Sequence, residues 1–172
     1  GSSLGPFLDS YHSLFGVLSY NTPISLGPEW LTCITTYWVP PLFGLAGFLI
    51  GWLYIWLDAV FYDEDASAAD SNQMQTQLHP SIPKVLVGIS FFTLQYWLSG
   101  ILFANHMDRT NILALMSFLA AGGFFALDRT TSGFITSAAT AIGGPLIEVG
   151  LFSSLPETWA YHYNDPGELG FF

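Results

Sequence analysis

An uncharged stretch of eighteen residues separates Arg109 from Asp128. At about 1.5 Å per helical residue, such a stretch is long enough to cross a hydrocarbon core about 30 Å thick. It ends on an adjacent acid and base, Asp128 and Arg129. Charges are costly in hydrocarbon, so this pair is expected where the helix meets headgroups and water. The sequence predicts a membrane-spanning helix and a polar turn at residues 130–132, which is either a plain connector or a docking surface.

The composition indicates an integral membrane protein of one domain. Hydrophobic residues make up 51% of the 172 residues and charged residues only 9%, whereas ordinary soluble domains carry about 25% charged residues. The formal net charge is −10, with three Lys and Arg in total. This balance excludes nucleic-acid binding and leaves no polybasic segment for anionic lipid headgroups. The single cysteine, Cys33, excludes an internal disulfide.

The pattern along the chain predicts an all-α bundle of about four transmembrane helices. The predicted spans cover residues 41–57, 85–107, 110–127 and 132–155. Pro40 and Pro41 are expected in the first turn of the first span, after a short approach helix at residues 30–37. Residues 14–18 are expected to form a short N-terminal interfacial segment. Residues 58–83 are acidic and poor in core-forming side chains, which predicts an exposed soluble loop.

Polar groups inside two predicted spans need partners. Gln95 and Ser99 are four residues apart and share a helix face, which should turn toward the bundle. Glu148 lies in an apolar run, where a charge costs about 2.5–3.5 kcal/mol at mid-helix. Gly143-Gly144-Pro145 is expected to break or kink the same helix. We therefore expect a neighbouring subunit or a bound cofactor to cover residues 143–148.

Four spans place both termini on one side of the membrane. Lys84 and Arg129 then share the other side with the acidic loop, and Arg109 lies on the side of the termini. The positive-inside rule favours an acidic loop that faces the cytosol or stroma.

Three segments together resemble the Insig (insulin-induced gene) family of polytopic membrane proteins. They are Trp38-Val39-Pro40-Pro41 followed by Gly44, Leu53-Tyr54 and Asp58; Asn105-His106 followed by Asn111-Ile112; and Phe125 to Phe134, FALDRTTSGF. Their order and spacing agree with the family over roughly residues 22–163. The chain departs from the family in lacking the outer two of six spans. Thr131 replaces a basic residue, and Leu42-Phe43 replace a cysteine pair.

The resemblance implies a compact, non-catalytic helix bundle that binds a sterol-like or lipid ligand among its helices and docks partner membrane proteins. It places Asp128 in a cytosol-facing motif that engages partners. The expected partner-binding residues are Asp128, Arg129, Ser132, Gly133 and Phe134.

The sequence gives no support for an enzyme, because its histidines are scattered and no metal-binding or nucleophile motif occurs. Two functions remain open. One is an Insig-type sterol- or lipid-sensing regulator that retains partner proteins in the endoplasmic reticulum. The other is a scaffold subunit of a larger membrane complex, such as an accessory subunit of an algal photosystem in the plastid thylakoid. The scarcity of Lys and Arg, the missing outer spans and an aromatic content of 17% favour the second.

No cofactor is required by the sequence, but a lipid, a sterol, or chlorophyll and carotenoid are candidate ligands between the helices. The expected contact residues are Gln95, Ser99, Asn105, His106 and Glu148. In a plastid setting His106 would be the candidate ligand of a chlorophyll magnesium ion; no other metal site is expected.

Overall fold

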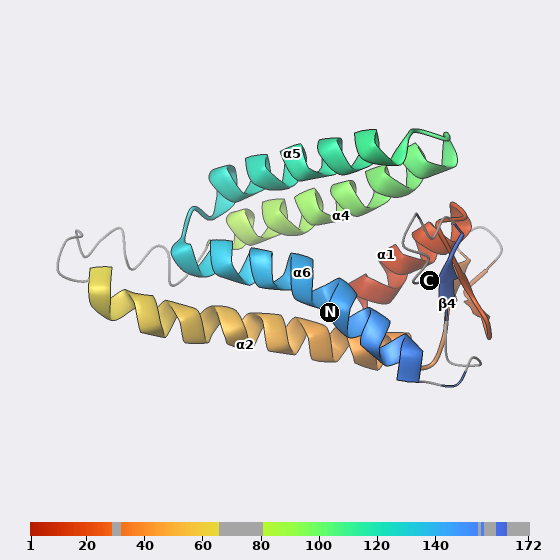
Figure 1. Ribbon diagram of the computed structural model, residues 1–172, viewed down its shortest axis with the longest axis horizontal. Coiled ribbons are helices and arrows are strands. Elements are labelled where there is room, and N and C mark those ends of the chain that lie inside the picture. The colour runs from red at the N-terminus through yellow and green to blue at the C-terminus, as the bar shows by residue number, and fades with distance from the viewer. Residues whose placement is uncertain (29–31, 66–80, 155, 157–160, 165–172) are drawn as a thin grey trace.

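A computed structural model of the chain describes residues 1–28, 32–65, 81–154, 156 and 161–164. Four of its helices are long and apolar enough to cross a membrane, and they run side by side along the long axis of the molecule (Figure 1). These helices are α2 (Val39–Asp65), α4 (Ile82–Ala104), α5 (Arg109–Leu127) and α6 (Thr131–Ser154). The prediction of a helical membrane bundle with four spans is therefore confirmed.

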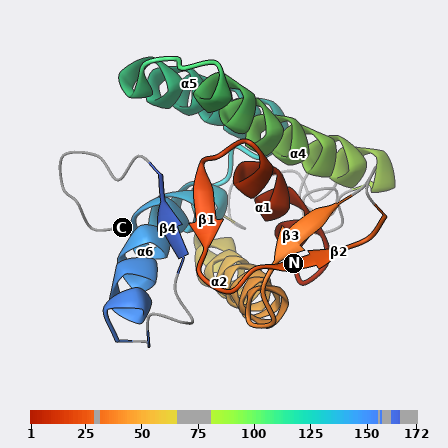
Figure 2. The ribbon, with the colours of Figure 1, turned by 90° about the vertical axis from the view of Figure 1, so that its right-hand side faces the viewer.

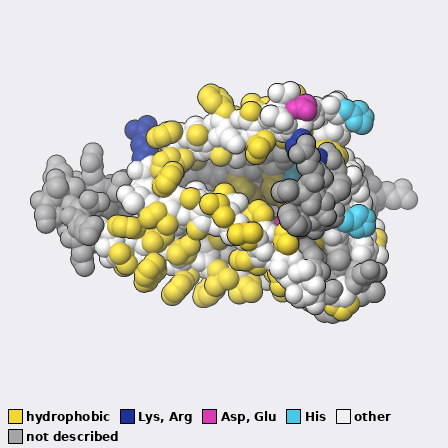
Figure 3. All heavy atoms as spheres, in the orientation of Figure 1, with side chains coloured by type: hydrophobic (Ala, Val, Ile, Leu, Met, Phe, Trp, Pro, Cys, Tyr) yellow, Lys and Arg dark blue, Asp and Glu magenta, His cyan; other side chains and the backbone are white. Residues whose placement is uncertain are grey.

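The apolar side chains of the spans point mostly outward. Phe48, Phe118 and Ile142 are examples of exposed large side chains on α2, α5 and α6. Figure 3 shows hydrophobic side chains along the long sides of the molecule. Lipid tails are as apolar as these side chains, so in a bilayer this surface needs no protein cover.

The four spans pack as two pairs, α4 with α5 and α2 with α6. The short helix α1 (Leu4–Leu14) contacts both α2 and α4, and so joins the pairs at the end that holds the strands (Figure 2). The contacts are close at two glycines. A Cβ at Gly5 would overlap the ring of Phe43 on α2, and a Cβ at Gly100 on α4 would overlap the ring of Phe15.

The buried apolar core lies at this same end. Strand β1 (Leu18–Tyr20) pairs antiparallel with β4 (Tyr161–Tyr163), and β2 (Ile24–Leu26) pairs antiparallel with β3 (Cys33–Thr35). The core centres on Leu18, Tyr20 and Val39. Trp38 and Tyr161 stack against each other beside it, with ring centroids 5.9 Å apart. The strands and α1 thus form a small cap at one end of the bundle.

The N-terminal part differs from the sequence-based expectations. The approach helix predicted at residues 30–37 is wrong over residues 32–37, because Cys33–Thr35 form strand β3, where β-branched residues pair with β2. Residues 30 and 31 lie outside the described residues. The segment expected to lie along the interface, residues 14–18, instead ends α1 and begins β1. Leu18 is almost fully buried in the core.

The spans differ from the predictions mainly at their ends. Helix α2 has Pro40 and Pro41 in its first turn and continues past Leu57 to Asp65, into the predicted acidic loop. The remainder of that loop, residues 66–80, lies outside the described residues. Helix α6 runs through Pro145 without a break. Its second half runs at an angle to its first (Figure 1), as expected where proline removes a backbone hydrogen bond.

Candidate functional site

The turn between α5 and α6 is held by the carboxylate of Asp128, which points inward. It accepts hydrogen bonds from the hydroxyl of Tyr54 on α2, at 3.1 and 3.2 Å, and from the backbone N–H of Thr130, at 3.1 Å. The Thr130 hydroxyl donates to it at 2.5 Å and accepts from the N–H of Gly133 at 2.9 Å. Asp128 therefore ties α2 to the first turn of α6, which Thr130 caps.

Close packing around the carboxylate explains why the residue at position 133 is a glycine. A Cβ at Gly133 would overlap the carboxylate of Asp128. Ser132 is also buried, with 3% of its surface exposed. Of the five predicted partner-binding residues, Asp128, Ser132 and Gly133 thus have internal contacts.

The other two predicted residues, Arg129 and Phe134, lie on the outward side of the turn, together with Phe125. Phe134 is 62% exposed and Phe125 is 61% exposed. Arg129 is exposed between them in sequence, in the left-handed backbone region with φ 68°. Its Nε donates a hydrogen bond to the carbonyl of Phe125. We call Phe125, Arg129 and Phe134 the turn surface.

A buried polar cluster lies at the opposite end of the bundle, where α1 meets α4. The carboxylate of Asp9 accepts hydrogen bonds from the hydroxyls of Tyr20 and Tyr96, the latter at 3.0 Å. The ring of His12 stacks on Tyr96 with centroids 4.1 Å apart. Its Nε2 lies 2.9 Å from the Tyr96 carbonyl and 3.0 Å from the Ser99 hydroxyl. A carbonyl only accepts, so Nε2 carries the proton and donates.

Burial changes the ionisation of both α1 groups. It raises the pKa of the Asp9 carboxyl above its usual range, although hydrogen bonds from Tyr20 and Tyr96 act in the opposite direction. Burial lowers the pKa of His12, against the effects of the Tyr96 carbonyl and of Asp9. Both shifts act in the direction of the neutral form, because burial penalises a charge on either group.

Glu148 receives its partner from the C-terminal strand. The hydroxyl of Tyr163 on β4 donates to Glu148 Oε1 at 3.2 Å. The side chain of Asn164, next in sequence, donates to the carbonyl of Gly16 at 2.7 Å. Glu148 therefore has a hydrogen-bond partner within the chain, and cover of residues 143–148 by another subunit or a cofactor stays a prediction.

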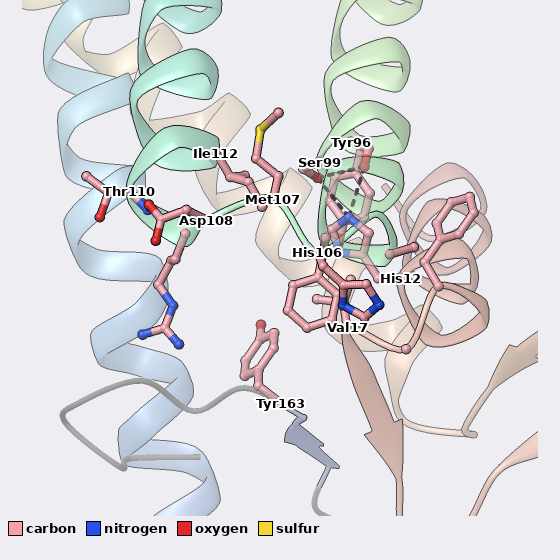
Figure 4. Close-up of a pocket in the computed structure, with 15 residues that line it drawn as sticks. His12, Val17, Tyr96, Ser99, His106, Met107, Asp108, Thr110, Ile112 and Tyr163 are labelled. Atoms are coloured by element: carbon pink, nitrogen blue, oxygen red, sulfur yellow. Dashed lines mark hydrogen bonds between the residues drawn. The ribbon is translucent and has the colours of Figure 1, made fainter.

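A pocket of about 1520 Å³ opens beside the polar cluster, between the end of α1, the α4–α5 turn and β4 (Figure 4). Its polar lining includes His12, Ser99, His106, Asp108, Arg109 and Tyr163. The turn is fixed by Asp108, whose Oδ1 accepts from the N–H groups of Thr110 and Asn111 at 2.9 and 3.3 Å. His106 is exposed and has a positive φ of 58°.

The structure brings together only some of the predicted ligand-binding residues. Ser99 and His106 line the pocket, and Glu148 lies beyond it, bonded to Tyr163. Asn105 instead donates from its amide to the Ile101 carbonyl of its own helix at 2.8 Å. Gln95 Nε2 is buried and has no hydrogen-bond partner among the described residues.

Sequence reasoning missed Asp9, His12 and Tyr96 as site residues. One signal was available, because Gly5, Asp9 and His12 are spaced four and three residues apart and so share a helix face. Their partners on α4 and β1 are distant in sequence, and no local pattern connects them. In the part of the chain that the structure describes, no group of three or more His, Cys, Asp or Glu side chains could hold a metal ion.

The fold and these sites define a polytopic membrane protein with four spans, a small cap at one end and a constrained turn at the other. The family model for insulin-induced protein (INSIG) matches residues 13–165, and the chain belongs to this family. Members of the family are regulatory membrane proteins without enzymatic activity. Neither a curated protein nor a solved structure matched the chain. The family match favours the regulator over the photosystem subunit, and it gives no support to a thylakoid location or a bound pigment.

Proposed function

We propose that this protein is an Insig-type regulator of the endoplasmic reticulum, which retains partner membrane proteins through the turn surface and responds to a lipid or sterol in the pocket. The observation that supports retention most directly is the division of the motif into two layers. Its inner layer, Asp128, Ser132 and Gly133, fixes the backbone, and its outer layer presents Phe125, Arg129 and Phe134.

The outer layer has the composition of a protein-binding surface. Aromatic residues and arginine are enriched among the residues that contribute most to binding energy. Arg129 is held in a sparsely populated backbone conformation by a bond from its own side chain and by the ordered turn around it. A surface that is already ordered pays less conformational entropy on binding, which favours affinity.

The response to a lipid or sterol is assigned to the pocket. It lies at the opposite end of the spans from the turn surface, and α1 forms part of its wall. Helix α1 also contacts both helix pairs. A ligand that binds the pocket differently in two arrangements of α1 would shift the balance between them and so alter the packing of the pairs.

The test is a photo-crosslinking amino acid placed at Phe134, in cells that express the protein with a fluorescent tag. Phe118, also exposed but midway along α5, takes the same amino acid as the matched control. We expect one multispan membrane protein to be crosslinked from position 134 and not from 118, with fluorescence in the endoplasmic reticulum.

The variant Arg129→Asn removes the guanidinium but suits a positive φ, because Asn tolerates that region. It should abolish the crosslink while the protein stays folded in the membrane. Crosslinks that are identical with and without Arg129, or that join only lipid, would overturn the proposal for the turn surface. Fluorescence confined to another membrane would overturn the location.

A further inference from the structure

We infer that the pocket binds the headgroup of a zwitterionic phospholipid, with the phosphate at Arg109 and the ammonium group at Asp108. This inference rests on the proposed function in one respect: it names the lipid class that occupies the pocket. It adds a charged recognition element on the membrane side opposite the turn surface.

The position of the pocket suits a headgroup. Helix α4 ends at Ala104 and α5 begins at Arg109, and both helices have the length of a membrane span. The turn that joins them therefore lies at the level where hydrocarbon gives way to headgroups. Arg109 and Asp108 lie in or beside this turn and line the pocket. The pocket therefore lies at the depth of a lipid headgroup in the bilayer.

The walls match the two parts of such a lipid. Phe15, Phe103 and Ile112 give the pocket an apolar side next to the spans. Beside them, α4 and α5 present exposed apolar side chains such as Leu113, along which acyl chains can extend. The charged residues lie at the end of the spans, as a headgroup requires.

The charges select the headgroup. Among the described residues that line the pocket, Arg109 is the only Lys or Arg, and its sequence neighbour Asp108 carries the opposite charge. The guanidinium is suited to phosphate oxygens. One Asp108 oxygen holds the N-terminus of α5, which fixes the carboxylate at the rim of the pocket. An adjacent anion and cation fit a phosphate and an ammonium group joined by two carbons.

Other membrane lipids fit less well. A sterol or a diacylglycerol offers a hydroxyl group and no charge for Arg109 or Asp108. An anionic phospholipid could place its phosphate at Arg109, but it brings no ammonium group for Asp108 and meets a chain of net charge −10. The zwitterionic lipid is the class that uses both charged residues.

The experiment is native mass spectrometry of the full chain in detergent, after exposure to four lipids separately. The probes are palmitoyl-oleoyl phosphatidylcholine, palmitoyl-oleoyl phosphatidylglycerol, dioleoylglycerol and cholesterol. We expect one phosphatidylcholine to be retained per chain, in preference to the other three. Arg109→Gln should reduce its retention about tenfold or more, because a charge-assisted hydrogen bond is lost. Lys84→Gln, in the first turn of α4 at the other end of the spans, is the matched control and should retain it.

A second pair of variants tests the apolar wall. Ile112→Trp fills the pocket and should also abolish retention, whereas Leu113→Trp, on the exposed side of the same helix, should not. Soluble phosphocholine should compete with the lipid, since the headgroup provides the specificity. Thermal unfolding of each variant confirms that it is folded.

The outcomes separate this inference from the proposed function. Equal retention of phosphatidylcholine and dioleoylglycerol or cholesterol, or full retention by Arg109→Gln, would overturn the headgroup inference and leave the lipid response standing. A preference for phosphatidylglycerol would overturn it in the same way. Retention of no lipid at all would overturn both. The crosslinking experiment at Phe134 tests the turn surface separately, and its result does not affect the lipid-retention experiment.

Discussion

Asp9 and His12 lie one helical turn apart on α1, and burial favours the neutral form of both. The consequences for stability have opposite signs. A neutral carboxylic acid is favoured at low pH, whereas a neutral imidazole is favoured at high pH. The contact between α1 and α4 therefore depends on pH through two groups that work against each other, and a single variant at His12 separates them.

The pKa of His12 in the folded chain lies below its ordinary value of 6.5, so the unfolded chain takes up the proton first as the pH falls. The stability that neutral His12 contributes is complete above about pH 6.5 and is lost progressively below it. We predict that the difference in melting temperature between the wild type and His12→Gln shrinks between pH 7.5 and 5.0. Asp9 is present in both proteins. A difference that stayed constant over this range would contradict the assignment.

The inward carboxylate of Asp128 makes a prediction about stability that is separate from partner binding. Asp128→Ala removes the acceptor for Tyr54 and for the first turn of α6, which should cost about 1–3 kcal/mol. A drop in melting temperature of several degrees in detergent is expected, whereas Arg129→Asn should cause little change. Equal melting temperatures for Asp128→Ala and the wild type would show that the tether does not stabilise the fold.

At the scale of elements, the approach of α1 to α4 depends on a glycine. The end of α1 reaches Gly100 so closely that a methyl group there would overlap the ring of Phe15, whereas Gly88 on the same helix has open space around it. In α4 as a whole, apolar side chains are mostly exposed to lipid. Gly100, the one buried residue of α4, lies in the part of the helix that the end of α1 contacts.

Alanine substitutions at these two glycines form a matched pair. Alanine has a higher helix propensity than glycine at both positions. Gly88→Ala should therefore be neutral or slightly stabilising. Gly100→Ala should displace α1 and lower the melting temperature. Proteolytic cleavage between α1 and β1, at the sequence around Phe15, reports the displacement directly and should increase only for Gly100→Ala. Equal cleavage of the two variants would contradict the close packing.

The link between β4 and α6 is a second element-scale contact. We predict that Tyr163→Phe and Glu148→Ala each destabilise the fold, and that the double variant costs less than the sum of the two. The measurement is a double-mutant cycle on the free energy of unfolding in detergent. Strict additivity would mean that the two side chains do not interact.

At the scale of the molecule, α1 holds two helix pairs together although it lies almost entirely before the matched family region, residues 13–165. Deleting residues 1–14 should therefore let the pairs separate while leaving each pair intact. Spin labels at Phe48 on α2 and Phe118 on α5, in a variant that lacks Cys33, would give a broader and longer distance distribution after the deletion. An unchanged distribution would show that α1 is not needed to hold the two pairs together.

The spans were predictable because membrane insertion depends on local hydropathy, as for residues 110–127. The cap was not, since β1 and β4 pair residues from opposite ends of the chain and each strand has only three residues. The site was partly predictable. Ser99 was singled out as a polar residue inside an apolar span and His106 as a candidate chlorophyll ligand, and both line the pocket. Asp128 was expected on the surface, because no pattern in the sequence shows that Tyr54 donates to it.

The pairing of Leu18 with Tyr163 sets an order of events during synthesis. Residues at the start of the chain leave the ribosome first, but their partner strand emerges only after all four spans have been made. Contacts between such distant segments form slowly, because the entropy of closing a long loop is lost before the contacts contribute any favourable free energy. The N-terminal segment must therefore wait on its side of the membrane with its apolar side chains uncovered. During that interval the unfinished protein presents the kind of surface that chaperones bind. The pairing of β4 with β1 then covers the apolar side chains of the N-terminal segment and ends their exposure to chaperones.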